Sequence, residues 1–285
     1  MIKRACAWFD RQSDFFQIIV FLILIFLVRT FGFGLYQVPT GSMETTMLVG
    51  ERFFADKLTV HFTPIKKGDI ISFNSPNFDY SDNCVIKLWQ KYIWGPDNWT
   101  KRVIGVPGDH VQGKIENGAP VVYVNGVKLD EPYVNKYPLI AVWTNNSNIQ
   151  SKKLFKRSSL MYFSFDPQKK FDDQPFYTIN PVDIAQHNLI PQILEPNKPM
   201  KNQSGNDEFD VKLEDEEYWV MGDNRLGSYD SRSWGVLNAE HIHGRIKFCI
   251  FSVDTLKSWW IIYVLRHPLE FWSKIRWSRC CRFVR

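Results

Sequence analysis

The first 35 residues carry the strongest hydrophobic pattern in the chain. Residues 15–28 read FFQIIVFLILIFLV, with Gln17 as the only polar position, and apolar residues predominate past Arg29 to Leu35. About 20 such residues are enough for a helix to cross a bilayer, and one arginine can extend its side chain to the interface. The pattern therefore predicts a transmembrane anchor over residues 15–35.

A cleaved secretory signal would show the same charged start and apolar run. No small-x-small cleavage site follows the run, which favours a retained anchor. Basic residues tend to stay on the cytoplasmic side of a span, and Lys3, Arg4 and Arg11 precede this one. We therefore expect residues 1–14 in the cytoplasm and the remaining chain on the opposite side.

Short β-type runs separated by turn residues follow the anchor: GERFFADKLTV, GDIISFNSP, KRVIGVPGD, APVVYVNGVKL, EEYWVMGDN and HGRIKFCIFSV. Asn125-Gly126, between VVYV and VKL, is typical of a β-hairpin turn. Between residues 131 and 206 this pattern is lost. The predicted fold class is mostly β: a single N-terminal transmembrane helix, then a β-rich domain (36–130 and 207–254) with an inserted second subdomain (131–206).

The net charge of +5 is concentrated in the tail, residues 255–285. Seven basic residues there oppose Glu270, which leaves a net charge of −1 for the rest of the chain. The same tail contains Trp259, Trp260, Phe271, Trp272 and Trp277. Basic and aromatic residues together are typical of a membrane-surface segment. We expect this tail to contact lipid, and we expect no nucleic-acid partner.

Metal and cofactor sites are not expected. The cysteines are odd in number and lack paired C-x-x-C units, so at most one disulfide could form: Cys6, Cys84, Cys249, Cys280 and Cys281. His241 and His243 would share one face of a strand, but no third ligand stands at a recognisable spacing.

Three short motifs carry candidate chemistry. Ser42 lies in PTGSM just after the anchor, and Lys101 opens KRVIGVPGD 59 residues later. GDNR at 222–225 is followed by SYDSRSWG at 228–235. A serine needs a base, and a lysine can be one only when neutral. Its usual pKa near 10.4 must fall by roughly three, equivalent to about 4 kcal/mol. Burial among apolar residues and a neighbouring cation such as Arg102 would lower it.

The order of these motifs behind an anchor resembles the type I signal peptidases of bacteria. The resemblance covers the anchor, residues 36 to about 130 and residues 213 to about 250. It implies a membrane-anchored serine endopeptidase that removes signal peptides from exported precursors through an acyl-enzyme, with Ser42 as nucleophile and Lys101 as general base. It also implies the cell's inner membrane, a single pass and a catalytic domain on the extracytoplasmic side.

The resemblance assigns further residues to the site. Thr40, with the Ser42 backbone N–H, would form the oxyanion hole, and Ser228 would orient the lysine. Cleavage would follow small-x-small residues, with shallow pockets lined by Tyr36, Val38, Met47 and Trp99. Thr45 and Leu226-Gly227 depart from the family pattern and put only the local loop shape in doubt.

The two Asp-x-Arg units, Asp223-x-Arg225 and Asp230-x-Arg232, put opposite charges at a spacing that shares one face of a strand. We expect these residues and Arg102 to form structural ion pairs near the lysine. Two other functions remain open. One is a dedicated Ser/Lys peptidase of a conjugation or secretion system with a single substrate. The other is a non-catalytic membrane-anchored β scaffold in which Ser42 is only a turn residue.

Overall fold

A computed structural model describes residues 13–93, 95–136, 139–144, 189–194, 198–199, 206–253 and 275–284, with positions 266, 268, 272 and 273. Several predictions of the sequence analysis lie outside these residues: those for Lys3, Arg4, Arg11 and Cys6, for most of the 131–206 insert, and for Trp259, Trp260 and Phe271.

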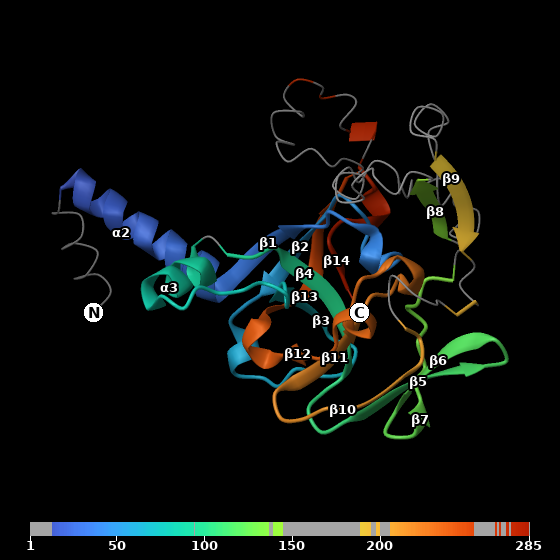
Figure 1. The fold of residues 1–285 in the computed structure, drawn as a ribbon. Coiled ribbons are helices and arrows are strands. Elements are labelled where there is room, and N and C mark those ends of the chain that lie inside the picture. Colours follow the sequence, from blue (N-terminus) through green and yellow to red (C-terminus); the bar gives the residue numbers. More distant parts are fainter. Residues whose placement is uncertain are drawn as a thin grey trace.

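The N-terminal helix projects from the domain (Figure 1). Helix α2 (Asp14–Leu27) continues as a π-helical turn η1 (Val28–Gly32), and together they form a 19-residue apolar helix long enough to cross a membrane. The expected end at residue 35 is wrong. Phe33 begins strand β1 (Phe33–Gln37), which pairs antiparallel with β2, so sheet hydrogen bonds replace helical ones from Phe33 onward.

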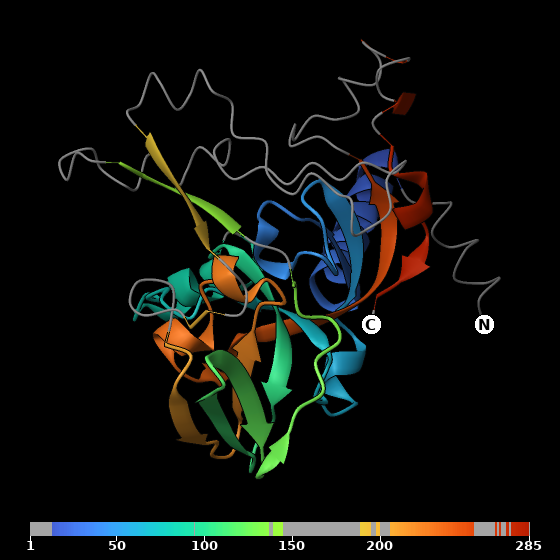
Figure 2. The same cartoon turned by 90° about the vertical axis from the view of Figure 1, so that its right-hand side faces the viewer.

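The fold beyond the anchor is mostly β, as predicted (Figures 1 and 2). The largest sheet has the order β1-β2-β13-β3-β4-β11-β12, with β14 paired to β13, and its strands run antiparallel. Their bounds are β2 (Glu51–Asp56), β3 (Ile70–Asn74), β4 (Asn98–Gly105), β11 (Glu217–Met221), β12 (Leu237–Asn238), β13 (Ile242–Ser252) and β14 (Arg282–Phe283).

A second sheet has the order β10-β5-β6-β7, formed by β10 (Phe209–Lys212), β5 (His110–Glu116), β6 (Ala119–Val124) and β7 (Val127–Lys128). The hairpin predicted at Asn125-Gly126 is confirmed, since both residues have the positive φ angles (53° and 77°) that a tight two-residue turn requires. In the described part of the insert, β8 (Leu139–Thr144) pairs with β9 (Leu189–Leu194).

The other helical segments are short: α3 (Cys84–Tyr92), α6 (Ser231–Trp234), and the 3-10 turns η2 (Gly41–Met43), η3 (Thr59–His61), η6 (Arg225–Gly227), η7 (Ala239–His241) and η8 (Trp277–Arg279). Of these, η2, η6 and α6 contribute to the candidate site.

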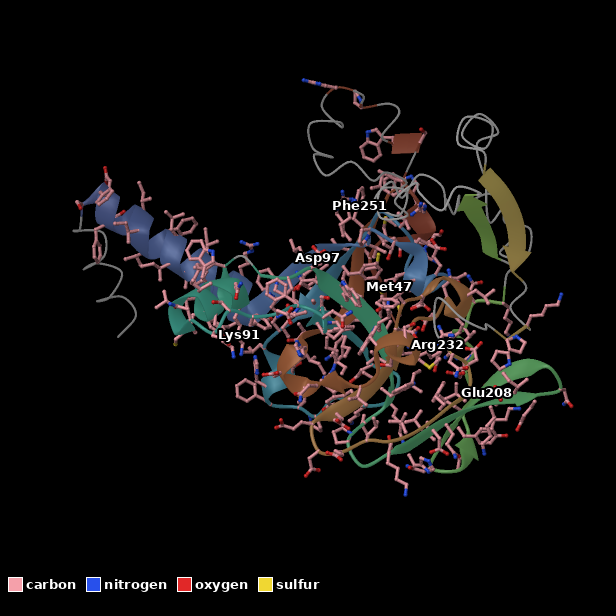
Figure 3. All side chains as sticks on the ribbon, viewed as in Figure 1. Met47, Lys91, Asp97, Glu208, Arg232 and Phe251 are labelled. Carbon is pink, nitrogen blue, oxygen red and sulfur yellow. The ribbon has the colours of Figure 1, made fainter. Side chains whose placement is uncertain are left out.

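The core anchors the turn that carries Ser42. Met43 is the last residue of this turn and Met47 follows it by four residues. Both pack with Phe53 of β2 and Ile246 of β13 in one buried cluster. Burying a large apolar side chain stabilises a fold by roughly 1.5–3 kcal/mol. These two methionines therefore hold the chain around Ser42 against the large sheet, and Figure 3 shows Met47 in the interior of the domain.

The described end of the tail also packs on the domain. Val284 joins the same core cluster, and β14 pairs with β13. Three arginines donate hydrogen bonds to carbonyl groups of the 44–49 loop: Arg276 to Val49 at 2.9 Å, Arg279 to Thr45 at 3.2 Å and Thr46 at 3.1 Å, and Arg282 to Thr46 at 2.7 Å.

Two of these arginines, Arg279 and Arg282, also neutralise a buried acid. The Glu51 carboxylate, fully buried at the start of β2, lies 2.5 Å from Arg279 Nε and 3.4 Å from Arg282 Nη2. It accepts two further hydrogen bonds, from the Leu48 N–H and the Ser252 hydroxyl, each at 2.9 Å. Arg279 and Arg282 are therefore paired within the protein, and the lipid contact expected for the tail as a whole stays a prediction.

Replacing Arg279 with alanine should destabilise the fold, because Glu51 would lose its nearest cation and two loop carbonyls would lose a donor. Removing one partner of a buried ion pair costs about 3–5 kcal/mol, which lowers the melting temperature by on the order of 10 °C in a domain of this size. Thermal unfolding in detergent measures the shift.

The matched control is Lys128→Ala, which removes the exposed ion pair between Lys128 and Glu116. Such surface pairs contribute about 0–1 kcal/mol. Equal shifts in the two variants would show that the Arg279 contacts contribute no more than a surface pair.

Candidate active site

Ser42 and Lys101 meet in the structure, although 59 residues separate them. Ser42 lies in η2, the turn that follows the extended residue Thr40, and Lys101 lies on β4, between β3 and β11 in the large sheet. The Lys101 ammonium Nζ donates a hydrogen bond to Ser42 Oγ at 2.9 Å. The structure thus brings a hydroxyl and an amine together at the distance that direct proton transfer needs.

The Lys101 side chain is only 5% exposed. Side chains alternate along a strand, so Lys101 shares its side of β4 with Trp99 and Val103, and it lies opposite Ile71 of β3. Burial among such neighbours disfavours the charged form and lowers the pKa of Lys101 from its usual 10.5 to about 8.

Nearby charges modify this effect in opposite directions. Asp230 and Asp223 raise the pKa of Lys101, and Arg232 lowers it. The expectation that Arg102 is the cation responsible is wrong. Arg102 follows Lys101 directly in the strand and so points to the other side of the sheet.

Arg102 pairs with Asp223. Its Nε and Nη2 donate to the two carboxylate oxygens at 2.8 and 2.7 Å, and its Nη1 donates to the Gly68 carbonyl at 2.9 Å. Its guanidinium carbon lies 3.9 Å from the ring centroid of Tyr133. Both charges are buried, so this bidentate pair holds β4 beside the GDNR segment with its charge satisfied.

Arg232 and Asp230 form a second bidentate pair, with both nitrogen–oxygen distances at 2.9 Å. Arg232 also donates to Asp207 at 2.7 Å. Burial opposes ionisation of Asp230, but Arg232 and the Gly222 N–H outweigh it and hold the pKa of Asp230 below its usual value. Figure 3 shows Arg232 inside the domain.

The two Asp-x-Arg units therefore differ from expectation. Asp230 does pair with Arg232, but Asp223 pairs with Arg102, and Arg225 forms a bidentate pair with Glu131 instead. The prediction that the charges of each unit share one face of a strand is wrong, because both units lie in turns and short helices. Residues 131–135, assigned by sequence to the insert, pack at this site, since the Asn135 N–H donates to the Asp223 carbonyl at 2.9 Å.

Asn224 holds the Ser42 turn and was not predicted. Its backbone N–H donates to the Ser42 carbonyl at 3.1 Å, and its side-chain amide donates to the Gly41 carbonyl at 3.0 Å. The GDNR motif contained the signal, but nothing local distinguishes an asparagine that binds a distant turn from one that makes its own turn.

Ser228 lies close to the nucleophile turn but makes no hydrogen bond to the base. The implied Ser228–Lys101 hydrogen bond is not formed, and the buried Ser228 hydroxyl has no hydrogen-bond partner in the described part of the chain. A Cβ atom at Gly222 would lie 2.2 Å from Ser228 Oγ and 2.5 Å from the Ser42 carbonyl oxygen. Only glycine allows the three segments to approach this closely.

Glu44 is a second group missed by the sequence analysis. Its buried carboxyl lies against Gly41, where a Cβ would come within 2.8 Å of it. Burial raises the pKa of Glu44 to about 8, although Arg276 and Arg279 favour its charged form. An acid that is partly neutral at physiological pH therefore lies beneath the turn that carries Ser42.

The four expected pocket residues do not form one surface. Tyr36 packs against the cluster that contains Val38 and Met47, which are almost fully buried. Trp99 belongs to the cluster around Phe73 and lies edge-on to Tyr229, with ring centroids 5.8 Å apart. Tyr36 and Trp99 are partly exposed residues, whereas Val38 and Met47 offer little surface to a ligand.

The two histidines do not share a strand face. His241 ends the turn η7, whereas His243 lies within β13 against Tyr36 and Ser72. Burial lowers the pKa of His243 to about 3, so it stays neutral. Among the residues that the structure describes, no group of three or more His, Cys, Asp or Glu side chains could hold a metal ion.

The sequence of this chain is similar to those of known proteins. Signal peptidase I of Bacillus amyloliquefaciens is 27% identical over 242 residues, covering 84% of this chain and 88% of that protein. Signal peptidase I of Buchnera aphidicola subsp. Schizaphis graminum is 25% identical over 255 residues, covering 83% and 74%. A solved signal peptidase I from Enterococcus faecalis is 21% identical, covering 64% and 97%, but its TM-score of 0.29 is too low to support any statement about fold.

A family model described as "Signal peptidase, peptidase S26" matches residues 12–251, from the start of the apolar helix almost to the end of β13. This range includes Ser42, Lys101 and the GDNR segment. Because the match spans most of its length, the chain belongs to the signal peptidase family, peptidase S26.

Proposed function

We propose that this serine endopeptidase removes signal peptides from exported precursor proteins with Ser42 as the nucleophile and Lys101 as the general base. The observation that carries the assignment is the 2.9 Å hydrogen bond between Lys101 Nζ and Ser42 Oγ at a buried lysine. A scaffold that used Ser42 only as a turn residue would have no reason to bury an amine against its hydroxyl.

The first half of the reaction follows from this contact. When Lys101 is neutral, the hydrogen bond reverses and Ser42 Oγ donates to Nζ. As Oγ attacks the scissile carbonyl carbon, its proton moves to Nζ and the carbonyl oxygen becomes negative. The Ser42 N–H and the Thr40 hydroxyl stabilise this oxyanion. Thr40 suits the role because it is exposed and its hydroxyl does not cap the following turn.

The second half returns the proton. The Lys101 ammonium protonates the leaving amine as the peptide bond breaks, which leaves an ester on Ser42 and a neutral lysine. Lys101 then takes a proton from water as the water attacks the ester. The acid is released and Ser42 Oγ regains its proton, so the enzyme returns to its starting state.

The substrate backbone is proposed to add to β1. This strand lies at one edge of the large sheet and leads directly toward Ser42. An extended peptide can pair with such an edge, with its side chains pointing alternately toward and away from the enzyme. The partly exposed Tyr36 and Trp99 are proposed to limit the space for side chains near the scissile bond, which favours small residues there.

The proposed topology puts this domain outside the cytoplasm, with a single pass through the inner membrane. The family is membrane-associated, and the chain has the matching apolar helix over Asp14–Gly32. The basic residues Lys3, Arg4 and Arg11 support a cytoplasmic N-terminus. Ser42 follows the helix by only ten residues, which puts the nucleophile near the outer membrane surface, where exported precursors emerge.

Ser42→Ala and Lys101→Ala should each abolish cleavage of a purified precursor by the detergent-solubilised protein. The double variant should be scarcely worse than either single one, because nucleophile and base act as one unit. Lys128→Ala, at an exposed lysine far from Ser42 in the sequence, should retain full activity. More than about a tenth of the activity in Lys101→Ala would exclude this base.

The pH dependence should report the burial of Lys101. Only the neutral amine accepts a proton, so kcat/KM should rise with pH and level off above a pKa of about 8. A profile that still rises at about pH 10 would indicate a lysine with its ordinary pKa.

Stability should follow the same titration. The unfolded chain protonates Lys101 below its usual pKa of 10.5, whereas the folded chain does so only below about 8. The unfolded state therefore binds more protons between these values, and stability should increase with pH across this window. Lys101→Met should be inactive, and its stability should lack the increase with pH that Lys101 causes. A folded but inactive variant would also show that the loss of activity is not a loss of fold.

The Ser228 hydroxyl, which has no partner in the described part of the chain, is proposed to turn toward Lys101 during the reaction and orient its amine. Ser228→Ala should then lower kcat/KM by about one to three orders of magnitude, the effect of losing one orienting hydrogen bond. Its thermal stability should be unchanged or higher, because the removed hydroxyl is buried without a partner. Unchanged kinetics would show that Ser228 takes no part in orienting Lys101.

A further inference from the structure

Helix α3 exposes its apolar side chains. Val85 is 75% exposed and Trp89 is 55% exposed, and Ile86, Leu88 and Ile93 are about half exposed. The spacing of these residues, three or four apart, puts them on one side of the helix. An ordinary surface helix in water turns such a side toward the core. Here this side faces outward.

One polar side chain of α3, Gln90, contacts the neighbouring loop and is partly buried. Gln90 Oε1 accepts a hydrogen bond from the Ser81 N–H at 2.9 Å, which fastens the helix to the preceding loop. Asn83 caps the first turn by accepting from the Val85 and Ile86 N–H groups at 3.0 and 3.3 Å. The helix is thus well formed and held by polar contacts, so its outward apolar side is part of its folded arrangement.

The position of α3 indicates what covers this side. Helix α2 and α3 lie at the same end of the molecule in Figure 1, and Figure 3 shows Lys91 of α3 at that end. No residue of α2 is buried, and its long axis points away from the domain. A bilayer that surrounds α2 therefore extends across the end of the domain where α3 lies.

The charges on α3 suit the same environment. Lys87 and Lys91 are exposed and lie one helical turn apart, outside the apolar side. Lysines on the polar side of an amphipathic helix are attracted to anionic headgroups while the apolar side enters the acyl boundary. The described part of α3 contains no acidic residue that would oppose this contact.

We propose that α3 is an interfacial membrane helix that lies on the bilayer entered by α2, with Val85, Leu88 and Trp89 in the headgroup and acyl boundary of anionic lipid. The anchor alone fixes one point of the domain and leaves it free to rotate and tilt. A second contact at α3 fixes the face that the domain presents to the membrane. This proposal rests on membrane anchoring and is independent of the identity of the catalytic residues.

Quenching of Trp89 by brominated lipid tests the contact. The full chain and its Trp89→Phe variant are reconstituted into phosphatidylcholine vesicles with about a third phosphatidylglycerol, with and without bromine on the acyl chains. The difference in emission between the two proteins isolates Trp89. We expect bromine to reduce this difference by half or more. A difference unaffected by bromine would show Trp89 in water or against protein and would overturn the proposal.

Two controls accompany this measurement. Trp219→Phe isolates a tryptophan that is 3% exposed inside the domain, which bromine should not reach. Val85→Asp with Leu88→Asp should restore Trp89 emission in brominated vesicles, whereas Val127→Asp, at an exposed valine of the β6–β7 hairpin, should not. If Val127→Asp restored Trp89 emission as much as the Val85→Asp, Leu88→Asp double variant does, the proposal would also be overturned. Labelling of Ser42 by an acylating probe should persist in every variant, which separates this test from that of the catalytic residues.

Discussion

The site depends on an amine that must be both buried and neutral. A lysine that carries its ordinary charge cannot accept the Ser42 proton, and a lysine in water is charged at neutral pH. The fall of its pKa from 10.5 to about 8 makes about a tenth of the molecules active at pH 7, and it costs the fold about 3 kcal/mol. Trp99, Val103 and Ile71 supply the apolar surroundings that cause this fall.

The charges around Lys101 are arranged so that they do not cancel the effect of burial. A lone carboxylate beside the amine would stabilise the ammonium and restore a high pKa. Asp230 and Asp223 are instead each held by an arginine in bidentate contact. Breaking either pair would leave an uncompensated buried charge. The Arg102–Asp223 pair thus joins the GDNR segment to β4, and the Arg232–Asp230 pair lies within the SYDSRSWG segment, both at little electrostatic cost to the lysine.

Local patterns in the sequence predicted the parts of the fold that are local in origin. The apolar helix, the Asn125-Gly126 hairpin and the mostly β fold arise from neighbouring residues and were predicted. The approach of Ser42 and Lys101 came from family resemblance, because no periodicity connects residues 59 positions apart. The partners of Arg102, Arg225 and Arg279 were missed because a carbonyl or a distant carboxylate leaves no pattern beside the arginine. Helix α3 was not predicted because it lies between two β-type runs and its apolar residues face outward and not toward a core.

The contacts between the 44–49 loop and the tail arginines also order the events of biosynthesis. Arg279 follows Glu51 by 228 residues, and ribosomes add roughly 5–20 residues per second. Glu51 and the loop carbonyls therefore remain without these arginine partners for on the order of tens of seconds. A new chain already holds its anchor and both catalytic side chains during most of that interval. Its nucleophile turn acquires these contacts only after Arg279 has been synthesised.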